Sequence, residues 1–161
     1  MAVLIITAKP AFLPDPDDLA GWEPQGGLYH RQVGAHHLFL AECIEEVNRK
    51  QRAKHEHLAE LVRAARQAVP DGECYLIAHD RDLLKGSGSG DEGIFPEAGV
   101  AAVGSSLAGL VPDRHIYIFQ HVPQQDMFET LIVNLLDDIT AETVERTVSL
   151  IDGCTYETSL A

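Results

Sequence analysis

The chain has 161 residues, 45% of them hydrophobic, and a formal net charge of −13 at pH 7. This length fits one domain with a substantial core, so we expect residues 1–161 to form a single domain, and the hydrophobic fraction excludes a disordered acidic chain. The charge argues against duplex nucleic acid and anionic membranes as partners, because both are bound through cationic faces. Apolar runs are too short to cross a membrane, and the first residues lack the basic start of a signal peptide. We therefore expect a cytoplasmic protein.

Three short apolar runs predict buried strands. Residues 2–7 are rich in β-branched side chains and are closed by Pro10, which cannot donate to a strand ladder. Residues 74–78 form the second run, and residues 115–121, which are aromatic and β-branched, form the third and end before Pro123.

Residues 10–35 hold several prolines and glycines and no lasting periodic pattern, so we expect a long loop that covers the sheet, with a lid as the alternative. Residues 36–69 then show the 3–4 spacing of an amphipathic helix, for example at Leu40, Cys43 and Ile44. One straight helix of about 50 Å would exceed the domain. We therefore expect residues 36–69 to bend, to break in two, or to project and form the contact of a homodimer.

The second half of the chain predicts further helices. Residues 84–95 are rich in glycine and serine and predict a flexible loop. Residues 96–110 predict a tightly packed helix, with a strand at 100–103 as the alternative, and residues 126–136 predict another, with a strand at 130–133 as the alternative. A last helix is expected to start at Thr140, with half of a capping box, because Thr143 stands where Glu is usual.

Strands and helices alternate along the chain, which predicts an α/β fold. We expect a single three-layer domain with a mostly parallel central sheet, in which helices cover both faces.

Polar residues follow each predicted strand, where open parallel sheets bind their ligands. His79 and Asp80 end the second strand, and His121 ends the third. Histidine can serve as acid, base or metal ligand near neutral pH, and a neighbouring aspartate can orient the imidazole or share a metal. We therefore expect His79, Asp80 and His121 to form a catalytic site, or to hold a divalent metal if one is present. The alternative is that these polar residues are only exposed to solvent.

Three further residues at the same strand ends suit substrate binding. Lys9 and Arg81 would neutralise an anionic group, and Gln120 lies beside His121.

Other candidate residues are expected to be structural. Cys43, Cys74 and Cys154 are widely spaced and contain no CxxC pair, so they predict buried free thiols. Cys74 begins its strand, far from the predicted site, and is a poor candidate nucleophile. His55 and His57 are two residues apart, so they do not share a helix face and are expected at the surface.

Two functions from different classes follow. The first is a small α/β enzyme or ligand-binding domain, hydrolase-type, acting on a small molecule. The alternative is a non-catalytic acidic protein, inhibitor or immunity-like, that binds a basic protein, because residues 122–161 hold eight acidic residues and one base, Arg146. The sequence does not decide whether the protein is an enzyme.

Overall fold

The computed structural model describes residues 1–8, 13, 21–42, 51–79, 105–119 and 132–151. Its elements in chain order are β1 (Ala2–Ala8), β2 (Glu23–Gln25), β3 (Leu28–Val33), β4 (His36–Glu42), α1 (Gln51–Ala68), β5 (Glu73–His79), the short 3₁₀ helix η3 (Asp113–His115), β6 (Ile116–Phe119) and α4 (Ala141–Ile151), and residues 132–137 are also helical.

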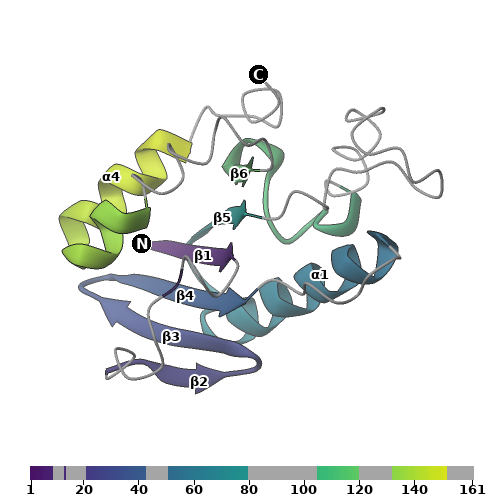
Figure 1. The fold of residues 1–161 in the computed structure, drawn as a ribbon, viewed down its shortest axis with the longest axis horizontal. Helices are drawn as coiled ribbons and strands as arrows, with labels where there is room; N and C mark the ends of the chain where they lie inside the picture. The colour runs from purple at the N-terminus through teal and green to yellow at the C-terminus, as the bar shows by residue number, and fades with distance from the viewer. Residues whose placement is uncertain (9–12, 14–20, 43–50, 80–104, 120–131, 152–161) are drawn as a thin grey trace.

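One six-stranded sheet organises the described residues, with the strand order β2-β3-β4-β1-β5-β6 (Figure 1). The strands β4, β1, β5 and β6 are parallel to one another, whereas β2 and β3 pair antiparallel with their neighbours. The α/β class is therefore confirmed. The prediction of a mostly parallel sheet is wrong, because the sheet is mixed.

Two-residue turns explain the antiparallel part of the sheet. Gly26 and Gly27 join β2 to β3 with φ angles of +57° and +87°, which glycine adopts without strain and which suit a tight hairpin. Gly34 and Ala35 likewise join β3 to β4. The prediction of a covering loop over residues 10–35 is therefore wrong for β2 and β3, and residues 10–12 and 14–20 lie outside the described part of the chain.

The predicted long helix over residues 36–69 is also wrong in its first part, because His36–Glu42 is the strand β4. Residues 38–41 are all buried between β1 and β3, and such a continuous apolar run fits a central strand as well as a helix. The helix α1 begins only at Gln51, and residues 43–50 are not described. A homodimer through residues 36–69 stays a prediction, although the buried part of β4 offers no surface for it.

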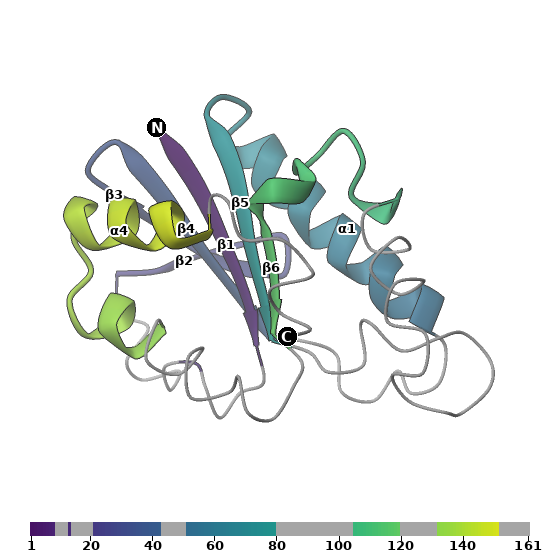
Figure 2. The same ribbon diagram turned by 90° about the horizontal axis from the view of Figure 1, so that it is seen from above.

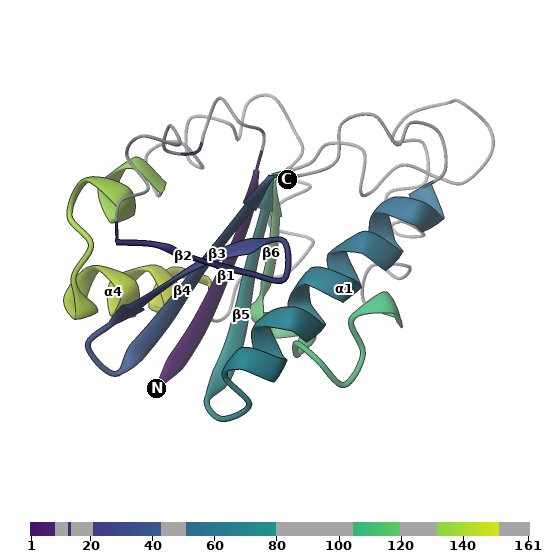
Figure 3. The ribbon, with the colours of Figure 1, turned by 90° about the horizontal axis from the view of Figure 1, so that it is seen from below.

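Each face of the sheet has its own buried cluster. Val3 and Ile5 of β1 pack with Leu58 and Val62 of α1 on one face, while Leu4 and Ile6 pack with Val144 of α4 on the other. This alternation follows from the strand geometry, which points successive side chains to opposite faces. Figures 2 and 3 accordingly show α1 and α4 on opposite sides of the sheet.

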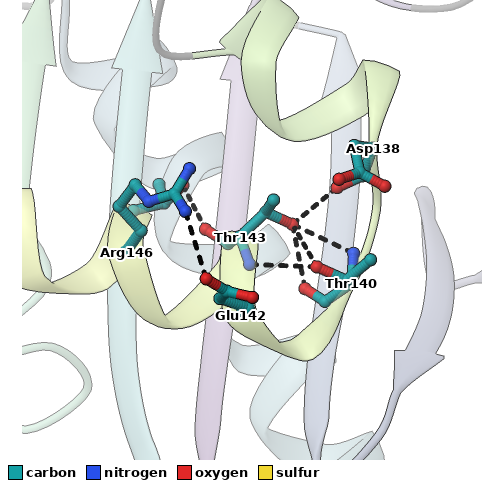
Figure 4. A network of polar contacts seen from close by, with 6 residues as sticks. Asp138, Thr140, Glu142, Thr143 and Arg146 are labelled. Carbon is teal, nitrogen blue, oxygen red and sulfur yellow. Dashed lines mark hydrogen bonds and ion pairs between the residues drawn. The ribbon is translucent and has the colours of Figure 1, made fainter.

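The start of α4 is closed by two threonines (Figure 4). The Thr143 amide donates to Thr140 Oγ1 at 3.2 Å, and the Thr140 amide donates to Thr143 Oγ1 at 2.9 Å. Thr143 thus takes the place of the usual glutamate. The capping box, which the sequence suggests to be half-formed, has both of its hydrogen bonds. The Thr143 hydroxyl also donates to the Asp138 carbonyl at 2.7 Å, which connects the helix to the residues before it.

Several other predictions can be compared with the structure. The first two strands are confirmed as β1 and β5, and the third as β6, although His115 belongs to η3. Residues 105–106 and 132–136 are helical, as expected, but residues 107–110 form turns, so the helix predicted over residues 96–110 is wrong there. Residues 84–95 lie outside the described chain. His55 is buried, so its predicted surface position is wrong. Within the described ranges, neither helix combines the length and apolar character that a membrane span requires.

Candidate functional site

The carboxyl ends of β1, β5 and β6 lie at one edge of the sheet. Thr7 of β1 is paired with Ala78 of β5, and His79 of β5 is paired with Phe119 of β6. Because these strands are parallel neighbours, they end side by side, as the sequence-based site requires.

The residues predicted for this site are themselves largely outside the described part of the chain. The backbone of His79 ends β5, but its side chain is not described. The other five lie in undescribed segments: Lys9, Asp80, Arg81, Gln120 and His121. Their convergence therefore stays a prediction.

The strand order adds a second observation about this edge. After β1, the chain continues with strands on the β4 side of β1, whereas after β5 it continues to β6, on the opposite side. The connections after β1 and β5 thus diverge. In open α/β sheets such a point, where the strand order reverses, is where ligands bind beyond the carboxyl ends.

A cavity of about 410 Å³ lies at the opposite, amino end of β5, and we call it the amino-edge pocket. Its polar lining comes from three segments: Arg66 near the end of α1, Glu73 at the start of β5, and Arg114 with His115 in η3. The sequence-based site did not include this pocket.

His115 lines the amino-edge pocket and is buried, with only 3% of its surface exposed. Its Nδ1 atom lies 3.2 Å from the Cys74 carbonyl, and Arg114 Nε donates to its Nε2 atom at 3.3 Å. A carbonyl can only accept, so Nδ1 carries the proton and Nε2 accepts. The imidazole also stacks on Tyr75 at a centroid distance of 4.1 Å.

Cys74 lines the same pocket, and its surroundings disfavour a role as nucleophile. Burial raises the pKa of its thiol to about 11, and the nearby charge of Arg66 opposes this shift only in part. The thiolate is the reactive form of cysteine, so the raised pKa disfavours reaction of Cys74 near neutral pH. The prediction of a buried free thiol is confirmed for Cys74, whereas Cys43 and Cys154 lie outside the described part of the chain.

Two further histidine contacts lie on β3 and β4. His30 Nε2 is 2.9 Å from His37 Nδ1, and His30 also stacks on Phe39. On the other face, His36 Nδ1 accepts the Ala2 amide at 3.0 Å, and His36 Nε2 lies 3.0 Å from Glu145 Oε1 of α4. His36 therefore connects the starts of two strands to a helix.

These histidines do not form a metal centre within the described residues. No group of three or more His, Cys, Asp or Glu side chains there could hold a metal ion. The ring centroids of His30 and His37 are 5.1 Å apart, the ring planes are 18° from parallel, and His30 Nε2 lies at hydrogen-bond distance from His37 Nδ1. This arrangement suits one shared proton better than a common metal ion.

Sequence reasoning missed the residues of the amino-edge pocket because each has an ordinary local explanation. Arg66 is a basic residue in the last turn of a helix, where cations are favoured, and His115 reads as the first residue of a strand. The only signal was that Arg114 and His115 precede the apolar run of β6. That signal does not reveal that the end of α1 lies beside them.

Comparisons with protein-family models, with curated proteins and with solved structures found no match to this chain.

Proposed function

We propose that the protein is a small α/β enzyme of the hydrolase type, or a ligand-binding domain, with its site at the carboxyl edge of β1, β5 and β6. The observation that carries this proposal is the reversal of strand order between β1 and β5, because ligands of open α/β sheets bind beyond the carboxyl ends of the strands at such a point. The proposal assumes a three-layer domain, in which helices cover both faces of the sheet. A ligand would then reach the strands at this carboxyl edge.

The proposed chemistry uses the polar residues that follow these strands. His79 and His121 would act as an acid/base pair or as ligands of a divalent metal, with Asp80 orienting an imidazole or ligating the metal. Lys9, Arg81 and Gln120 would bind the anionic and polar groups of the substrate. The register His79↔Phe119 supports this pairing, because it sets the ends of β5 and β6 next to each other.

Substitution of the two histidines tests the proposal. The wild-type protein is assayed for hydrolysis of p-nitrophenyl acetate and p-nitrophenyl phosphate, and for binding of Zn²⁺ and Mn²⁺ by calorimetry. His79→Ala and His121→Ala should abolish the activity or the metal binding and lower the melting temperature by no more than a few degrees. His57→Ala is the matched control, because His57 is a partly buried histidine of α1.

Two results would contradict this function. One is a wild-type protein that neither hydrolyses these esters nor binds these metals. The other is a pair of histidine variants that lose stability and nothing else.

A second function, binding to a basic protein, is favoured by the surface around α4. Asp137, Asp138, Glu142 and Glu145 are all exposed, and Arg146 is the only base in the described residues 132–151. Complementary charges accelerate association and lose effect as salt rises.

Charge reversal tests this second function. The immobilised chain should capture a basic protein from lysate at low salt, with the yield falling at high salt. Glu142→Lys should reduce the yield, while Glu60→Lys, an equal charge change at an exposed position of α1, should not. A yield that does not depend on salt would exclude this function.

A further inference from the structure

We infer that the amino-edge pocket is a second binding site, which takes a small organic monocarboxylate with an apolar body. The pocket lies at the amino ends of β5 and β6, at the opposite edge of the sheet from the proposed catalytic site. Its volume of about 410 Å³ lies within the range of small-molecule sites, roughly 300–1,000 Å³.

Arg66 provides the first charged group. Its Nη1 atom donates to the Val69 carbonyl at 3.4 Å and to the Asp71 carbonyl at 3.3 Å. These contacts hold the guanidinium in place at the wall of the pocket. A guanidinium carries five N–H donors, and the contacts of Arg66 with the described residues involve only Nη1. The group is thus held in place and keeps donors for a carboxylate.

Arg114 provides the second charged group, and His115 orients it. The buried imidazole is fixed by the Cys74 carbonyl on one side and by stacking on Tyr75, and it accepts the Nε–H of Arg114. The hydrogen bond to this buried imidazole therefore restricts the orientation of the Arg114 guanidinium, whose side chain is otherwise flexible. Arginine binds carboxylates through two parallel hydrogen bonds, which is the strongest geometry for this pair.

The remaining lining determines the class of ligand. Leu110, Val111 and Pro112 form an apolar wall, which suits a hydrocarbon or aromatic body. Glu73, whose carboxylate accepts the Tyr75 hydroxyl at 2.8 Å, places one negative charge beside the two arginines. Together with the net charge of −13, this charge disfavours a dianion such as a phosphate monoester more than it disfavours a monoanion.

Calorimetric titration with benzoate, acetate and phenyl phosphate tests the inference. Benzoate should bind best, because acetate lacks the apolar body and phenyl phosphate carries the second charge. Arg66→Gln and Arg114→Gln should each weaken benzoate binding about tenfold or more, the usual loss for a hydrogen bond to a charged group. Arg63→Gln is the matched control, an exposed arginine of the same helix that does not line the pocket.

Two more variants make the test independent of the stability of α1, since Arg66 also binds carbonyls at the end of that helix. Glu73→Gln should strengthen benzoate binding several-fold, and Leu110→Ala should weaken the binding of benzoate but not that of acetate. His79→Ala should leave benzoate binding unchanged, which separates this site from the proposed catalytic site. The inference is overturned if the wild-type protein does not bind benzoate, if Arg63→Gln weakens binding as much as Arg114→Gln does, or if phenyl phosphate binds more tightly than benzoate.

Discussion

The Nε2 atom of His30 faces the Nδ1 atom of His37 at 2.9 Å, across the antiparallel pair β3–β4. Only one proton fits between two nitrogens that face each other in this way. Burial is the main cause that lowers the pKa of both imidazoles below the usual 6.5, and the charges of His30 and His36 lower the pKa of His37 further, while Glu23 acts in the opposite direction on His30.

This pair predicts that the protein loses stability in mild acid. Below about pH 6.5 the unfolded chain binds protons at these histidines that the folded protein does not bind. The free energy of unfolding therefore falls as the pH falls below this value, and these histidines do not change it at higher pH. The melting temperature should therefore be lower at about pH 5.5 than at about pH 8, and the difference should shrink in a His30→Gln/His37→Gln variant. An equal reduction in His57→Gln would contradict this origin.

The turn between β2 and β3 predicts a sensitive contact with α1. A Cβ atom at Gly26 would lie 2.9 Å from the Cβ of Ala64, and the φ of +57° is unfavourable for alanine by about 1–2 kcal/mol. Gly26→Ala should therefore lower the free energy of unfolding, measured in urea, by more than Gly21→Ala does. Gly21 has a φ of +92°, and no atom of the described residues lies within 4 Å of its added Cβ, so it serves as the control for the backbone cost.

The same contact can be relieved from the other side. Ala64→Gly removes the opposing Cβ, and it should recover part of the stability lost in Gly26→Ala despite its own cost in a helix. Absence of any recovery would mean that the turn does not press against α1.

The threonine cap of α4 predicts an unequal effect for two buried threonines. Thr143→Val removes a hydroxyl that accepts the Thr140 amide and donates to the Asp138 carbonyl, so the loss should be about 1–3 kcal/mol in urea unfolding. Thr147→Val is the control, because the Thr147 hydroxyl only donates to the Thr143 carbonyl one turn earlier in the same helix. A larger loss in Thr147→Val would contradict this account of the cap.

The raised pKa of Cys74 predicts slow thiol chemistry. In a Cys43→Ser/Cys154→Ser variant, dithiobis-nitrobenzoate should react with Cys74 slowly at about pH 8, and fast only after unfolding in urea, since a thiol with a pKa of about 11 is almost fully protonated there. Rapid, stoichiometric labelling of the folded protein would show an accessible and reactive thiol instead.

The predicted elements that agree with the structure are those with unambiguous local patterns. β1 is a short run rich in β-branched residues that ends before Pro10, β5 is a short apolar run that follows a turn, and α4 combines a threonine cap with one apolar stripe. β4 was missed because Leu38–Ala41 is buried on both faces, so its apolar residues do not alternate, and Leu40 happens to begin a 3–4 spacing that continues to Cys43 and Ile44.

The sequence contains a turn motif for the β2–β3 hairpin, but the surrounding prolines and glycines led to the prediction of a loop. Gly26-Gly27 between two short segments is a recognised two-residue turn, but the prolines before it favoured a loop. The candidate sites differ in the same way. The carboxyl edge follows from strand ends that the sequence reveals, whereas the amino-edge pocket is lined by both Arg66 and Arg114, which only the packing of α1 on the sheet brings to one pocket.

The central place of β1 affects how the chain must fold during synthesis. Val3 pairs with His37 on one side and with Cys74 on the other, so this wholly buried strand is made well before either neighbour. At roughly 5–20 residues per second, several seconds pass before β5 leaves the ribosome. During that time β1 is an unpaired β-branched segment of the kind that aggregates, so the nascent chain needs either a chaperone or early local collapse onto β3 and β4.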